Sequence, residues 1–123
     1  MSVRPNSNRS LGSRGEAAAA RYLQSKGFTL LARNYRTSTG EIDLIAHDGP
    51  TLVFVEVKLR RGLGHGYPAE SVTPRKQAKI RQVAEEYLAN VEASAEPESA
   101  RFDVVELLVS GNRARVRHIE DAF

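Results

Sequence analysis

The sequence predicts an α/β domain in which helices pack on a mixed β-sheet, in the order helix, three strands, helix, two strands. Two segments, residues 12–26 and 73–91, carry apolar residues at helical spacing. The segments between and after them contain the β-branched, aromatic and alternating apolar residues that are typical of strands. The chain has 123 residues, which fits one domain with a hydrophobic core of its own.

The N-terminal part predicts an arm and a first helix. Residues 1–10 carry almost no apolar side chains, so we expect a mobile arm followed by a single domain over residues 11–123. The helix expected at 12–26 contains a run of alanines, the residue type with the highest helix propensity. Gly27 follows it, and glycine is common just after the end of a helix.

Three strands are expected next, over residues 28–36, 41–47 and 51–59. The second strand alternates, with Ile42, Leu44 and Ala46 on one face and Glu41, Asp43 and Ile45 on the other. The third strand is apolar on one face and carries Leu52, Phe54, Glu56 and Lys58 on the other. Apolar residues on both faces favour a central strand that is covered on each side.

A glycine-rich loop and a second helix follow. Residues 60–71 contain three glycines and a proline, and we expect a flexible flap beside a binding groove. Thr73 is suited to cap the helix that follows, and Pro74 is suited to its first position. An apolar stripe along this helix, residues 73–91, predicts that it packs on the sheet.

The last two strands are expected at 101–109 and 113–120, joined by a tight turn. Asp103 lies on the first of them, and we expect it to have a structural role and to pair with Arg101 or with an arginine of the final hairpin. The histidines are isolated from one another and lack metal-ligand spacing, so they are expected at the surface or in loops: His47, His65 and His118.

The three middle segments also carry charge where a sheet interior is expected. The turn Asp48-Gly49-Pro50 makes the second and third strands antiparallel neighbours, so Asp43 and Glu56 come within one or two residues of facing each other. Two carboxylates at that distance repel each other unless they share a proton or hold a cation. Lys58 follows Glu56 by two residues and therefore lies on the same face of the strand.

This pattern predicts a site for a divalent metal ion with a lysine ammonium beside it. Converging carboxylates suit Mg²⁺ or Mn²⁺, which polarises a phosphate oxygen and lowers the pKa of bound water. Lys58 would add positive charge beside the attacking water or the developing phosphate charge. The competing interpretation is a half-exposed strand face on which Glu56 and Lys58 form a modest salt bridge.

The motifs GEIDLI, FVEVKLR and RGEAAAARYL resemble the YraN family of small bacterial proteins. That family is similar to the restriction-endonuclease-like superfamily with the PD-(D/E)xK signature, including the archaeal Holliday-junction resolvases. The resemblance implies that Asp43 is the signature aspartate, Glu56 and Lys58 are its Glu-x-Lys, and Glu16 is a helix glutamate that joins the metal site. Ile42 stands where the signature has proline.

Two of the acids have other interpretations. Ser13 and Glu16 form a capping-box pattern, and on spacing alone Glu16 is better explained as the residue that closes the helix N-terminus. Glu41 shares the face of Asp43 and could reach the same site, but we expect it at the solvent edge of the strand.

Basic residues surround the predicted site and suit phosphate contacts with a nucleic acid, most naturally DNA: Arg60, Arg61, Arg75, Lys76 and Lys79. The competing interpretation is a solvated helix face. The formal net charge of +3 is compatible with a polyanionic partner.

The composition argues against several kinds of site and several classes of protein. The chain has no cysteine, which rules out disulfides, zinc–thiolate sites and thiol catalysis. It has no apolar stretch of about 20 residues and no secretory signal, so we expect a cytoplasmic protein with no membrane partner. A carboxylate-pair glycosidase is disfavoured because there is no tryptophan and Lys58 would have no role.

The sequence thus favours a metal-dependent nuclease-like domain that hydrolyses phosphodiesters. The resemblance implies DNA, including branched DNA, and a symmetric junction would require a homodimer. The alternative is a non-catalytic module that binds nucleic acid or protein on the same fold.

Overall fold

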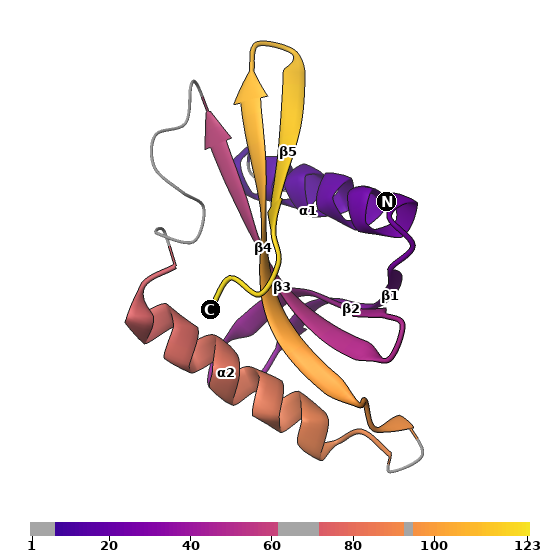
Figure 1. The fold of residues 1–123 in the computed structure, drawn as a ribbon. Coiled ribbons are helices and arrows are strands. Elements are labelled where there is room, and N and C mark those ends of the chain that lie inside the picture. The colour runs from indigo at the N-terminus through magenta and orange to yellow at the C-terminus, as the bar shows by residue number, and fades with distance from the viewer. Residues whose placement is uncertain (1–6, 62–71, 93–94) are drawn as a thin grey trace, which may run out of the picture.

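The structure is a computed structural model, and it describes residues 7–61, 72–92 and 95–123. Residues 1–6 of the expected arm and residues 62–71 of the expected flap lie outside the described residues, whereas residues 7–10, expected in the arm, belong to the first helix. The elements, in chain order, are α1 (Ser7–Ser25), β1 (Thr29–Arg36), β2 (Glu41–Asp48), β3 (Thr51–Arg61), α2 (Pro74–Ala89), β4 (Ser99–Ser110) and β5 (Arg113–Ile119). The predicted order of helix, three strands, helix and two strands is confirmed (Figure 1).

The five strands form one mixed sheet in the order β1-β2-β3-β4-β5. β3 and β4 are parallel and every other neighbouring pair is antiparallel. The parallel pair requires a crossover, and α2 supplies it between β3 and β4. β3 is therefore the central strand, as its apolar residues on both faces predict.

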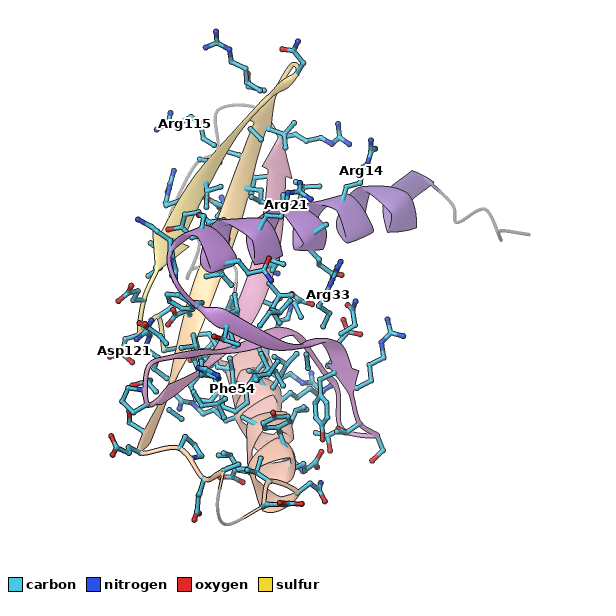
Figure 2. All side chains as sticks on the ribbon, turned by 90° about the vertical axis from the view of Figure 1, so that its right-hand side faces the viewer. Arg14, Arg21, Arg33, Phe54, Arg115 and Asp121 are labelled. Carbon is cyan, nitrogen blue, oxygen red and sulfur yellow. The ribbon has the colours of Figure 1, made fainter. Side chains whose placement is uncertain are left out.

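Each helix covers one face of this sheet. Leu23 of α1 packs with Val53 and Val55 of β3, which lie on one side of that strand. Ile80 and Val83 of α2 pack in a second cluster, whose β3 members are Leu52 and Phe54, on the opposite side. Phe54 lies in the middle of the molecule (Figure 2).

One predicted face assignment is wrong. Ile42 was expected beside Leu44 and Ala46, but it packs in the α2 cluster with Ile45 instead. The recorded pairing between β2 and β3 ends at Leu44 opposite Val55. The start of β2 is therefore not held in the ladder with β3, and strict alternation does not extend to Ile42.

The helix ends confirm the local signals in the sequence. The Thr73 side chain accepts a hydrogen bond from the Lys76 N–H, and Pro74 occupies the first position of α2. Gly27 has φ +95°, a conformation in which a side chain would be strained. Among the described residues, no helix combines the length and the apolar character needed to cross a membrane.

Candidate functional site

Asp43 lies where the ladder between β2 and β3 stops. The last recorded pair of that ladder is Leu44 with Val55, one residue short of Asp43 and Glu56, and the negative charge of Glu56 acts on Asp43. The Val57 N–H donates a hydrogen bond to Asp43 Oδ2 at 2.8 Å. A side-chain carboxylate therefore satisfies a backbone donor of the central strand at this point.

Two further carboxylates gather around Asp43. Carboxylate oxygens of Glu16, Glu41 and Asp43 lie within 4.8 Å of one another, and all three side chains are half-buried. They come from α1 and from the start of β2. We call these three residues the acidic cluster.

The capping interpretation of Glu16 is wrong. α1 begins at Ser7, so Glu16 lies well inside the helix and not at its N-terminal cap. Its place in the helix directs the carboxylate toward Asp43 and Glu41. Glu41, which we expected at the solvent edge, belongs to the acidic cluster and also pairs with Arg36.

Glu56 is turned toward two lysines. Its side chain is only 7% exposed, and its Oε2 lies 2.7 Å from Lys76 Nζ and 3.6 Å from Lys58 Nζ. Lys58 comes from the same strand and Lys76 from the first turn of α2. The predicted neighbourhood of Glu56 and Lys58 is therefore present, with a second ammonium from the helix.

The proximity of these groups alters how they ionise. Burial, together with the negative charge of Glu56, raises the pKa of Asp43 from 3.8 to about 7, against the hydrogen bond from Val57. Burial and the neighbouring Lys76 lower the pKa of Lys58. Burial opposes the charged form of Lys76 too, but its bond to Glu56 prevails and raises its pKa.

The basic residues predicted to bind phosphate divide into two groups. Arg60 pairs with the buried Glu106, and Lys76 pairs with Glu56. Arg61, Arg75 and Lys79 are exposed and form no ion pair with the residues that the structure describes. Because β3 continues to Arg61, Arg60 lies in the sheet and its side chain reaches the neighbouring strand.

A second polar cluster connects β4, β5 and α1. Arg101 Nε donates to Asp103 Oδ1 at 3.0 Å, which confirms the expected structural pairing. His118 was expected at the surface, but its side chain is 7% exposed, and its Nε2 lies 2.8 Å from Asp103 Oδ2. Its other ring nitrogen lies 3.2 Å from the Tyr22 hydroxyl. The hairpin register, which pairs Val105 with His118, is the signal that could have revealed this contact.

The arrangement suits a hard divalent cation. Two oxygens bound to one Mg²⁺ at about 2.1 Å each lie no more than about 4.2 Å apart. The acidic cluster has its oxygens within 4.8 Å, so small side-chain rotations would bring them to that spacing. Burial and the negative charge of the neighbouring Glu56 raise the pKa of Asp43, and a bound cation would favour its ionised form.

A family model and several similar proteins all point to the same family. The uncharacterised protein family UPF0102 matches residues 15–107. The UPF0102 protein of Rhodococcus opacus (strain B4) is 50% identical over 117 residues, covering 94% of this chain and 98% of that protein. The UPF0102 protein STH1475 of Symbiobacterium thermophilum is 49% identical with the same coverage. That of Chlorobium limicola is 48% identical, covering 93% and 92%.

Proposed function

We propose that this chain, which belongs to the uncharacterised protein family UPF0102, is a metal-dependent nuclease that hydrolyses phosphodiester bonds of DNA. The observation that supports it best is the meeting of Asp43 with Glu16 and Glu41 beside a strand that carries Glu56 and Lys58. Acids and a lysine in this arrangement are what metal-assisted phosphodiester hydrolysis requires.

Asp43 is the central ligand in this proposal. Glu56 is the partner that the sequence pattern predicts, and Glu16 is the partner that the family resemblance implies. Glu41 is a further donor that the structure adds. When bound, Mg²⁺ or Mn²⁺ would polarise a phosphate oxygen and acidify a bound water. The hydrogen bond from Val57 would hold the Asp43 carboxylate in one orientation while an ion enters or leaves.

Lys58 assists the reaction. Its Nζ lies beside Glu56, so a phosphate held at the acids would be within reach of an ammonium donor. An ammonium there stabilises the negative charge that develops on the phosphate oxygens. Partial burial makes this interaction stronger than it would be at an open surface.

Exposed cations near the site would hold the DNA backbone. Arg75 and Lys79 are four residues apart on α2 and therefore share one side of the helix. Arg61 ends β3, the strand that carries Glu56 and Lys58. Phosphate contacts of this kind give affinity without sequence preference. Branched DNA and a homodimer with two sites remain part of this proposal through the family resemblance alone.

A non-catalytic nucleic-acid-binding module is the second candidate. The observation that favours it is the contact of Glu56 with both Lys58 and Lys76, because this acid already has counter-ions without any metal. In such a module the charged groups would stabilise the fold, and cleavage would be absent.

A cleavage assay separates the two candidates. Wild type, Asp43→Asn and Lys58→Met are incubated with linear, single-stranded and four-way-junction DNA in Mg²⁺ or Mn²⁺. Asp48→Asn serves as the matched control, because Asp48 is also an acid of β2 but lies outside the acidic cluster. Cleavage by wild type and the control alone supports the nuclease. Equal cleavage by all four proteins contradicts it. An absence of cleavage by any of them, with DNA binding unchanged in the variants, also contradicts it.

A further inference from the structure

The ammonium group of Lys76 binds the Glu56 carboxylate at the candidate site. Lys76 Nζ lies 2.7 Å from Glu56 Oε2, the shorter of the two lysine contacts to that oxygen. Glu56 is an acid that the proposed function assigns to a divalent ion. The ammonium is therefore bound to an oxygen atom that such an ion would need.

The backbone of Lys76 is held in place independently of this ion pair. The Thr73 side chain accepts a hydrogen bond from the Lys76 N–H, and the Gln77 side chain donates to the Val72 carbonyl at 2.9 Å. Val72 is buried in the α2 cluster. The start of α2 is thus anchored, and the Lys76 side chain can leave Glu56 without a movement of the helix.

The two lysines differ in their freedom to leave. The Lys76 side chain is 43% exposed, whereas that of Lys58 is 24% exposed and projects from the central strand. A divalent ion on Glu56 would repel both ammonium groups at this distance. Lys76 can move into water at little cost, because nearly half of its side chain is already solvated.

We propose that Lys76 is a built-in counter-ion of Glu56 and that a divalent cation must displace it to occupy the site. The inference rests on the proposed function, since it takes Glu56 to be a metal ligand. It adds a role that the sequence did not indicate, because Lys76 was expected only as a phosphate-binding residue. Lys76 then sets the ion concentration at which the site fills.

Ion binding tests this directly, without any measurement of cleavage. Mn²⁺ is titrated by calorimetry into wild type, Lys76→Met and Lys79→Met. Lys79 is the matched control because it is an exposed lysine on the same helix that forms no ion pair with described residues. Lys76→Met should bind Mn²⁺ about tenfold more tightly, a change of about 1.4 kcal/mol. Lys79→Met should bind it as wild type does.

Amine labelling gives a second readout. A reagent that modifies lysine amines is applied to wild type with and without Mn²⁺, and modification of Lys76 and Lys79 is quantified by mass spectrometry. Mn²⁺ should increase the labelling of Lys76 at least severalfold and leave that of Lys79 unchanged, because Lys76 loses its ion pair with Glu56 and Lys79 forms no ion pair with described residues.

The outcomes separate this inference from the proposed function. If wild type binds Mn²⁺ but Lys76→Met binds it no more tightly, or if Lys79→Met gains as much, the counter-ion role is wrong while the metal site stands. Unchanged labelling of Lys76 leads to the same conclusion. If neither wild type nor Lys76→Met binds Mn²⁺, both the inference and the metal site are overturned.

Discussion

The carboxylate of Asp43 accepts a hydrogen bond from the backbone N–H of Val57 at 2.8 Å. This contact joins β2 to β3 just beyond the last pair of their ladder, Leu44 and Val55. It places an acid at a fixed position between two strands, next to Glu56 and within the acidic cluster. The cost of holding an acid there appears as a pKa of about 7.

The raised pKa of Asp43 predicts a pH-dependent penalty on stability. In the unfolded chain this carboxyl ionises near pH 4, whereas in the folded protein it holds its proton up to about pH 7. The folded state therefore binds more protons between these values, so stability falls as pH rises through this window. Asp43→Asn keeps an acceptor for the Val57 N–H and removes the charge.

Asp43→Asn should thus be more stable than wild type at pH 8, by roughly 2 kcal/mol, and similar to wild type at pH 4. Urea denaturation followed by circular dichroism at both pH values measures the difference. A wild type that is equally or more stable than Asp43→Asn at pH 8 would show that Asp43 carries no such penalty.

Divalent ions should stabilise the wild-type protein. An ion that binds only the folded state at about 100 times its Kd adds about 2.7 kcal/mol to the free energy of unfolding. Thermal denaturation at pH 8 with and without Mn²⁺ should show this gain in wild type and in Asp48→Asn. The gain should be absent in Asp43→Asn. Equal gains in all three proteins would place the ion elsewhere.

The exposed cations of α2 should contribute to nucleic-acid affinity. Arg75→Ala with Lys79→Ala removes two phosphate contacts, so the slope of log affinity against log salt should decrease in magnitude by about 1.8. Fluorescence anisotropy with a labelled duplex, over a range of salt concentrations, measures the slope. Arg113→Ala serves as a comparison that removes one charge elsewhere on the surface, because Arg113 is exposed and lies next to the turn between β4 and β5. An unchanged slope in the double variant would remove α2 from the interface.

Asp103 should be a determinant of stability and not of chemistry. It is fully buried and accepts hydrogen bonds from Arg101 and from the backbone N–H of Asp121, with His118 also in contact. Burial disfavours its charge, but the bonds from His118 and Arg101 prevail and lower its pKa. Asp103→Asn should therefore lose about 3 kcal/mol near pH 7, since it breaks a buried ion pair.

The sign of the Asp103 effect is opposite to that of Asp43. A lowered pKa stabilises the folded state above the ordinary pKa of an aspartate, and the stabilisation is lost as the pH falls through the lower folded value. The difference between wild type and Asp103→Asn should therefore shrink below about pH 4. A difference that stays constant down to pH 2 would mean that the charge of Asp103 is not its source.

The fold could largely be predicted because its signals are local. Turn residues and the Thr73-Pro74 start of α2 depend on neighbours in the sequence and hold in the structure, and alternation holds except at Ile42. One tight turn fixes the register of β2 and β3 as far as Leu44 and Val55, and this register brings Asp43 and Glu56 near each other. The prediction failed for Ile42, which lies beyond the last recorded pair of β2 with β3, a position that no periodicity reveals.

The candidate site was less predictable because it depends on contacts between distant elements. On spacing alone Glu16 was better explained as a helix cap, since the true start of α1, at Ser7, has no clear signal in the sequence, and only the family resemblance implied that it joins the metal site. Whether Lys76 points to solvent or to Glu56 depends on how α2 docks on the sheet. The contact of His118 with Asp103 likewise needs the register of the final hairpin.

The proposed nuclease activity depends on a divalent ion held by Asp43. The most direct measurement is the rate of DNA cleavage as a function of Mn²⁺ concentration for wild type, Asp48→Asn and Asp43→Asn. A saturating rise is expected for the first two proteins, and no ion-dependent cleavage is expected for Asp43→Asn. A curve for Asp43→Asn that coincides with that of wild type would contradict the proposal.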